Sequence, residues 1–329
     1  SDVCSSDLMK RNISILSSII LSTLLLAACS SSTEEETSST ALISLNITDA
    51  PVDEADEVVI EFTSVSLLPN EGDEIVFNFE DDDSTPDEDE SKMSIDLLAL
   101  QGVASQPLLE NVEIPAGSYN QIRLGVNAEY DDVMDSYITI AGTQHELRVP
   151  SGSQTGLKLN TPFTVAAGTA DMTVADDNSV YTIDFDLRKS ITDPKGQPGY
   201  ILKPVLRLIQ NINTGSISGT VAATLLEASH CSTGNAVYVF EGNDITPDDI
   251  TSADIDDTDI DPVTASLLSY DDITEVYSYE VGFLSEGAYT LAFTCVANLD
   301  DENDNVEVVF ETIDNVDVVA GENTDFPIE

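Results

Sequence analysis

The chain has 329 residues, a formal net charge of −51 at pH 7 and no tryptophan. So negative a surface repels nucleic acid and anionic lipid headgroups, and we expect neither as a binding partner. The charge is also unevenly distributed, because no Lys or Arg follows Arg207 while 26 acidic residues lie in 209–329. Two differently charged halves predict two domains.

The N-terminal region has the pattern of a secretion signal. Lys10 and Arg11 precede an apolar run that is short for a membrane-spanning helix. The run ends in Leu-Ala-Ala-Cys at 26–29 and resembles a bacterial lipoprotein signal. The resemblance implies a cleaved signal over 9–28 and a lipid on Cys29 that holds the protein on a membrane. A plain transmembrane anchor and a soluble secreted protein are the alternatives.

The residues on either side of this signal have separate interpretations. Residues 1–8 precede Met9 and fit no signal pattern, so we interpret them as an artefact and exclude them. Ser30, rather than Asp, follows the cysteine, which in this lipoprotein class implies sorting to the outer membrane of a Gram-negative cell envelope. Residues 29–40 are rich in Ser, Thr and Glu and predict a flexible tether.

The part from 41 to 210 predicts a β-sandwich domain. Ile43, Leu45 and Ile47 alternate with polar residues, and later runs are β-branched or aromatic and bounded by Pro, Asn, Asp or Gly. No stretch keeps a helical apolar period over three turns, although 95–100 predicts one helical turn. The fold class is therefore predicted as all-β.

Five motifs in this part identify a family resemblance. They are Asp49-Ala50-Pro51 and the segments at 114–119, 149–158, 184–190 and 202–207. In this order they resemble the domain of unknown function 4382 family, found in bacterial lipoproteins. The resemblance implies an envelope β domain and brings no activity with it.

The part from 214 to 329 predicts a second, acidic β-sandwich. Its strand-like segments include Gly215–Val221, Ala236–Phe240 and a Gly-x-Tyr-x-Leu hairpin at 287–291. The order is similar to the transthyretin-like sandwich of carboxypeptidase regulatory domains. Another immunoglobulin-like sandwich is the alternative, since both pack two sheets in the same way.

Two cysteines remain once Cys4 is excluded with the artefact and Cys29 is lipidated. Cys231 and Cys295 form an even pair in an oxidising compartment, and we predict a disulfide between them. A metal site is the alternative, but His230 is the one neighbouring ligand in the sequence.

The first domain offers one candidate ligand-binding face. Strand alternation over 181–188 places apolar side chains on one face and charged ones on the other. If neighbouring strands continue this face, it could bind an anionic ligand or a carboxylated glycan. The alternative is a structural ladder of cross-strand ion pairs. The candidate residues are Arg123, Lys158, Asp184, Asp186, Arg188, Lys203 and Arg207.

Two acidic loops of the second domain offer candidate calcium ligands, because calcium prefers hard oxygen atoms. Neither loop has the glycine and glutamate of an EF-hand, and solvated acids are the alternative. The candidates are Asp254, Asp256, Asp257, Asp259, Asp261, Asp300, Asp301 and Asp304.

The sequence does not favour an enzyme. His145 and His230 are each isolated, and no nucleophile elbow or phosphate loop is present. We expect no cofactor except calcium. The predicted function is a non-catalytic binding or structural module of the cell envelope, with a glycan or an envelope protein as ligand. The alternatives are calcium-dependent adhesion and a polysaccharide hydrolase, which would need two close carboxylates with raised pKa values.

Overall fold

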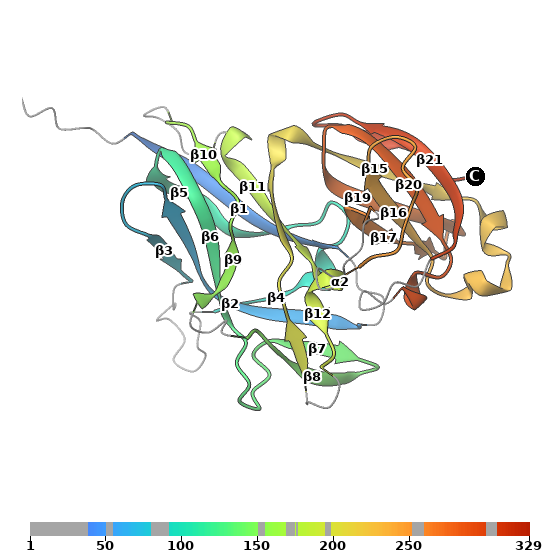
Figure 1. Cartoon of the computed structure of the whole chain (residues 1–329), viewed down its shortest axis with the longest axis horizontal. Coiled ribbons are helices and arrows are strands. Elements are labelled where there is room, and N and C mark those ends of the chain that lie inside the picture. Colours follow the sequence, from blue (N-terminus) through green and yellow to red (C-terminus); the bar gives the residue numbers. More distant parts are fainter. Residues whose placement is uncertain are drawn as a thin grey trace, which may run out of the picture. The chain divides into compact units, whose positions relative to one another are not determined.

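The structure is a computed structural model that describes residues 39–50, 55–79, 92–150, 155–168, 175, 177–194, 199–251, 260–300 and 308–329. Strands dominate these residues and form four sheets (Figure 1), which confirms the prediction of an all-β fold. Within these ranges, no helix combines the length and the apolar character that crossing a bilayer requires.

Two facing sheets built from strands between Thr40 and Gln210 form what we call the first sandwich. Strand β1 pairs in parallel with β11 and antiparallel with β5, so early and late segments share sheet 1. Ile43, Leu45 and Ile47 of β1 are fully buried, as the alternation predicted. The order of sheet 1 is β14 (Leu206–Gln210), β11 (Val180–Asp186), β1 (Thr40–Ala50) and β5 (Gln106–Pro115).

Sheet 2 lies opposite and is larger. One apolar core joins the two sheets, and in it the Tyr119 ring stacks on Phe163 while Phe163 meets Tyr181 edge-on. The main order is β10 (Phe163–Val165), β6 (Gly117–Asn127), β2 (Glu57–Pro69), β7 (Tyr137–Ile140), β8 (Thr143–Arg148), β13 (Tyr200–Leu202) and β12 (Ile191–Thr192). Three short strands extend this path: β3 (Ile75–Asn78) and β4 (Met93–Asp96) pair with β2, and β9 (Leu157–Leu159) pairs with β6.

Capping aspartates end two strands of the first sandwich. Asp96 ends β4 and accepts a hydrogen bond from the Leu98 N–H, which opens the 3-10 helix η1 (Leu97–Leu100). The predicted helical turn is therefore present, shorter at its start. Asp186 ends β11 and accepts from the Lys189 N–H, which opens the short helix α2 (Leu187–Ser190). The expectation that strand alternation continues to residue 188 is wrong.

Two four-stranded sheets form the second sandwich. All five residues of Ala236–Phe240 in β16 are buried, because sheet 4 has an apolar cluster on each face. Sheet 3 has the order β18 (Ser269–Asp271), β19 (Val276–Ser285), β15 (Thr214–Val221) and β22 (Asn323–Asp325). Sheet 4 has the order β17 (Thr264–Leu267), β16 (Ala236–Glu241), β20 (Gly287–Thr294) and β21 (Phe310–Val318).

Candidate functional site

The residues of the predicted charged face do not lie on one face. Arg123 and Lys158 are cross-strand partners on β6 and β9 of sheet 2. Asp184 and Arg207 are cross-strand partners on β11 and β14 of sheet 1. The single ladder is therefore corrected to two separate pairs, because the strands that carry them belong to different sheets.

Each of these two places has its own ion pair. Arg207 Nη2 lies 2.6 Å from Asp184 Oδ2, and its Nε also donates to that oxygen at 3.1 Å. Arg123 Nη1 lies 3.2 Å from Glu74 Oε1. The Lys158 side chain, on the same sheet as Arg123, is exposed. The Asp184–Arg207 pair is a cross-strand ion pair of the kind that the structural alternative predicts, whereas Glu74 precedes β3 and the cross-strand partner of Arg123 is Lys158.

Arg188 lies elsewhere, in the joint between the two sandwiches. It is carried by α2 rather than by β11, and it is buried. Its guanidinium donates to the Tyr238 hydroxyl at 2.6 Å and to the Ala297 carbonyl at 2.5 Å. It also lies 3.8 Å from Asp300 Oδ2 and over the Tyr238 ring. The first sandwich therefore supplies a cation to the interior of the second.

The joint is a connected polar network. The Tyr238 hydroxyl donates to Asp300 Oδ2 at 2.5 Å, and the Ile250 N–H donates to both Asp300 oxygens at 3.2 Å. Burial raises the pKa of the Asp300 carboxyl, while Tyr238 and Arg188 act in the opposite direction. Burial also raises the pKa of the Tyr238 hydroxyl, so it keeps its proton and donates it. Buried polar groups are stable when they are satisfied in this way.

A close backbone contact forms a second part of the joint. Gly282 of β19 packs against Gly102 of the first sandwich, which lies in the loop between η1 and β5. A Cβ at Gly282 would lie 2.5 Å from the Gly102 carbonyl oxygen and 3.0 Å from Val103 Cα. Two backbones can approach this closely only where no side chain stands between them.

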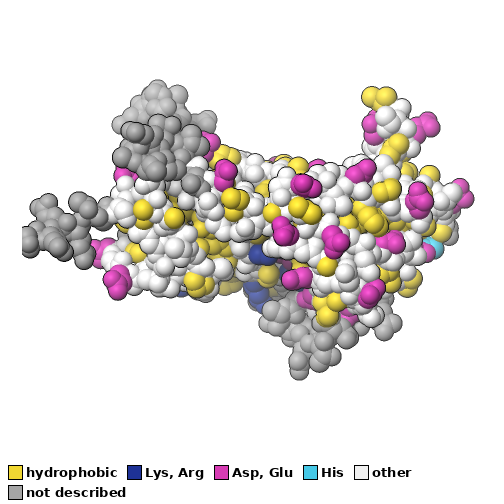
Figure 2. All heavy atoms as spheres, turned by 90° about the horizontal axis from the view of Figure 1, so that it is seen from above, with side chains coloured by type: hydrophobic (Ala, Val, Ile, Leu, Met, Phe, Trp, Pro, Cys, Tyr) yellow, Lys and Arg dark blue, Asp and Glu magenta, His cyan; other side chains and the backbone are white. Residues whose placement is uncertain are grey.

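A cleft of about 450 Å³ opens beside the joint, with walls from both sandwiches. Lys189 lies at this cleft, where its Nζ is 3.0 Å from Asp261 Oδ2. Figure 2 shows Lys and Arg side chains gathered in one place among more widely spread acidic ones. The charged residues that line the cleft are Asp184, Asp186, Lys189, Arg207, Glu241 and Asp261.

The two remaining residues of the predicted charged face, Asp186 and Lys203, lie in different surroundings. Asp186 lines the cleft, caps α2 and has a pKa raised by burial. Lys203 is exposed and is not part of the cleft lining. Tyr289 adds its edge to the lining, with its hydroxyl donating to the Ser285 carbonyl at 2.8 Å. The cleft thus holds paired charges rather than free cations.

A second hollow of about 510 Å³ lies on the outer side of sheet 3 next to Gly102. Serine and threonine hydroxyls from β15, β17, β18 and β19 line much of it, together with the carboxylates of Glu280 and Asp325. The Tyr279 hydroxyl there donates to the Phe326 carbonyl at 2.7 Å. No Lys or Arg is among the described residues of its lining, so it lacks charged donors.

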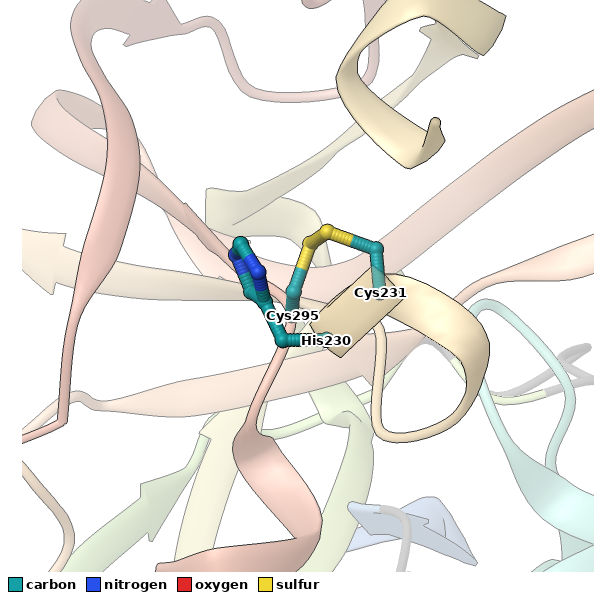
Figure 3. Close-up of side chains that lie close together, drawn as sticks. All are labelled: His230, Cys231 and Cys295. Atoms are coloured by element: carbon teal, nitrogen blue, oxygen red, sulfur yellow. A yellow bond between two sulfur atoms is a disulfide. The ribbon is translucent and has the colours of Figure 1, made fainter. Parts of the chain in front are cut away.

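The structure contains the predicted disulfide between Cys231 and Cys295 (Figure 3). Both residues are buried, and their Cα atoms lie 4.5 Å apart. His230 is nearby, but its Nε2 lies 2.8 Å from Glu311 Oε1. Because the sulfurs are bonded to each other, they cannot serve as thiolate ligands, and the three residues are not a metal site in this form.

The predicted calcium ligands fall into two groups. Asp254, Asp256, Asp257, Asp259, Asp301 and Asp304 lie outside the described residues, as does the predicted lipidation site Cys29. Asp300 belongs to the joint. Asp261 accepts from Lys189 and, with its other oxygen, from the backbone and hydroxyl of Thr251. These two aspartates therefore already have protein partners.

Comparison with known proteins gives few matches. No curated protein matches the chain. The solved structures that match include the Bacillus anthracis TIE protein, at 10% identity and a TM-score of 0.19. The match covers 88% of this chain, but this chain spans only 34% of the length of the TIE protein. The minor pilin GBS52 of Streptococcus agalactiae matches at 13% identity and a TM-score of 0.18, with 87% of this chain and 94% of that chain covered.

A third solved structure is a candidate polysaccharide-binding protein of the DUF1812 family from Bacteroides thetaiotaomicron, at 14% identity and a TM-score of 0.19. That match covers 77% of this chain and 76% of the other. TM-scores this low do not establish a shared fold. A family model gives a firmer result, since it matches residues 40–204, which is half of the chain. The protein belongs to the family described as Domain of unknown function (DUF4382).

Proposed function

We propose that the protein is a cell-envelope binding module that holds a neutral glycan, without catalysis, in the cleft between its two sandwiches. The pairing of charges in this cleft is the observation that carries the proposal. Arg207 is paired with Asp184, and Lys189 with Asp261. Each pair offers N–H donors beside carboxylate acceptors, which is the combination that sugar hydroxyls need because they both donate and accept.

The balance of charge in the cleft favours a neutral ligand over an anionic one. Four carboxylates and two cations line it, and both cations are already paired with acids. An anion would meet a net negative field there, in addition to that of the whole chain. We therefore replace the anionic ligand and the carboxylated glycan of the sequence-based hypothesis with a neutral glycan.

The same cleft does not favour a hydrolase. Glycoside hydrolysis uses two carboxyl groups that are free to contact the sugar, one of them with a raised pKa. Burial raises the pKa of Asp186, but its Oδ1 accepts the Lys189 N–H that begins α2. Asp184 is held by Arg207. Three of the four carboxyl groups that line the cleft, those of Asp184, Asp186 and Asp261, are engaged in the protein's own hydrogen bonds. The cleft therefore supports binding better than a reaction that needs two free carboxyl groups.

The location of the protein is part of the same proposal. The lipoprotein-type signal supports cleavage before Cys29, lipidation of that cysteine and attachment to the outer membrane. Cells that express the protein would be fed an alkyne fatty acid, and the label on wild type would be compared with Cys29→Ser. The proposal predicts label and membrane fractionation for wild type alone. Equal labelling of both would contradict it.

The fold of the second sandwich supports a finer assignment. Its two four-stranded sheets, with β15 and β22 pairing in parallel, suit the transthyretin-like sandwich that the sequence resembles. We propose this relationship as a hypothesis on topology. An experimental structure with a different strand order in either sheet would overturn it.

A glycan-array screen of the chain from Ser30 onward tests the binding proposal. The proposal predicts that wild type binds neutral oligosaccharides and that Glu241→Gln and Arg207→Gln weaken this binding at least tenfold. Lys158→Gln is the matched control, since it removes one cation from an exposed position on sheet 2. No binding to any neutral glycan, or an equal loss in the control, would contradict the proposal.

A further inference from the structure

A buried aspartate without a hydrogen-bond partner lies close to the joint. Asp249 is 1% exposed, and neither of its carboxylate oxygens has a partner in the described part of the chain. It directly precedes Ile250, whose N–H donates to Asp300. A buried carboxylate that accepts no hydrogen bond is strongly destabilising, so native proteins rarely leave one unsatisfied without a bound ion or water.

The neighbours of Asp249 are acids. The half-buried Asp248 carboxyl lies within hydrogen-bond reach of it, but two ionised carboxylates have no proton to share. Asp300 adds a further negative charge. Burial and then Asp248 raise the pKa of Asp249 to about 7, while its own backbone N–H acts in the opposite direction. Arg188, the cation that lies beside Asp300, is directed at Tyr238, Ala297 and Asp300.

We propose that Asp248 and Asp249 together bind a divalent cation, calcium in preference to magnesium. Two carboxylates provide up to four hard oxygen ligands, and calcium completes its six to eight ligands with carbonyls and water in flexible geometry. Magnesium demands a strict octahedron and releases its water reluctantly. The buried Asp249, rather than acidic character alone, distinguishes this place from the rest of an acidic surface.

The proposed cation also has a consequence for the joint. Asp249 and Ile250 are adjacent, and Ile250 holds the Asp300 carboxylate that faces Tyr238 and Arg188. Neutralising Asp249 removes the repulsion that it exerts on Asp300. Calcium therefore stabilises the contact between the sandwiches as well as the segment that carries the site. This inference does not depend on glycan binding.

Calorimetric titration and thermal melts of the chain from Ser30 onward test the proposal, with calcium, magnesium or chelator at pH 7.5 and constant ionic strength. Constant ionic strength removes the general screening that would stabilise so acidic a protein. Calcium is expected to raise the melting temperature of wild type and magnesium to have little effect. Asp249→Asn is expected to abolish calcium binding at this site and the associated rise.

Two variants keep the test independent of folding failure. In chelator, Asp249→Asn is expected to melt above wild type, because the amide removes a buried charge and can donate to Asp248. Asp272→Asn makes the same charge change at an exposed position of the second sandwich and should respond to calcium like wild type. A calcium response that persists in Asp249→Asn would place the ion elsewhere and overturn the proposal.

The calcium proposal would also be overturned if Asp248 and Asp249 share a proton instead of binding a cation. A raised carboxyl pKa stabilises the protein below the unfolded value of 3.8, and this stability is lost as the pH rises through about 7. If a proton alone serves the pair, wild type in chelator would gain stability from pH 8 to pH 6, Asp249→Asn would not, and calcium would do nothing at pH 7.5. A calcium response lost in Asp249→Asn supports the cation.

Discussion

The two sandwiches differ in how each is held together. The first has one continuous apolar core between its sheets, and every Lys and Arg after residue 29 lies between Lys92 and Arg207 in the sequence. The second has two smaller apolar clusters, one on each face of sheet 4, and the Cys231–Cys295 disulfide. The disulfide thus adds a covalent link to the sandwich that has the smaller apolar cores.

The difference in charge has a structural meaning. The second sandwich has no Lys or Arg of its own, yet Asp300 is buried inside it. Arg188 and Lys189 of the first sandwich supply the cations for Asp300 and Asp261. The uneven charge of the sequence therefore reflects the dependence of one sandwich on the cations of the other.

Among the variants that test this difference between the sandwiches, removing the disulfide should reduce stability most. The bond links residues 64 positions apart, and closing a loop of this size contributes about 4 kcal/mol in the chain-entropy model. Replacing Cys231 and Cys295 by alanine should lower the free energy of unfolding of the second sandwich by about that amount, measured by urea denaturation. A loss below about 1 kcal/mol would show that the small cores suffice.

Breaking the buried ion pair between Arg188 and Asp300 should have the second-largest effect on stability. Arg188→Met leaves Asp300 buried without its cation, and the expected loss of stability is about 3 kcal/mol. Asp300→Asn in the same chain should restore part of this loss, since no unpaired charge then remains. A double-mutant cycle by denaturation measures the coupling, and strict additivity of the two substitutions would contradict the joint.

A substitution at the Gly282 backbone contact should reduce stability less than loss of the buried ion pair. Gly282→Ala places a Cβ 2.5 Å from the Gly102 carbonyl oxygen, so the sandwiches must move apart. Overpacking of this kind costs about 2 kcal/mol. Gly287→Ala is the control, because a Cβ there has no atom within 4 Å. Equal melting temperatures of the two variants would show that the close approach does not matter.

The smallest effect is expected at the Asp184–Arg207 pair. The Arg207 side chain is 37% exposed, so water and salt screen the pair, and Arg207→Gln should reduce stability by only about 0.5 kcal/mol. The loss should shrink further in 0.5–1 M salt. A loss as large as that of Arg188→Met would mean that exposure does not separate the two arginines as proposed.

The sequence predicted the strands better than the site. Alternation at Ile43, Leu45 and Ile47 identified a buried strand face, and the cysteine count identified the disulfide. Alternation predicts a strand position for Arg188, but a capping hydrogen bond at Asp186 turns the chain into α2 before that residue. The apolar alternation of a strand does not show where the strand gives way to a helix from one residue to the next.

Other parts of the site left weaker signals. Tyr238 lies in an apolar run, and nothing local shows that its hydroxyl would bridge Arg188 and Asp300, whose positions depend on tertiary contacts. Asp249 resembles any acid in an acidic chain until its burial is known. One signal was available: a segment without cations that buries an acid must obtain its cation from elsewhere.

The dependence of the glycan cleft on both sandwiches can be measured by isothermal titration of wild type and Arg188→Met with the best neutral oligosaccharide from the array. Both proteins would be held well below their melting temperatures. Because the two walls of the cleft come from different sandwiches, weakening the joint should lower the affinity at least tenfold while each sandwich stays folded by circular dichroism. An unchanged Kd would place the ligand on one sandwich alone and contradict a shared site.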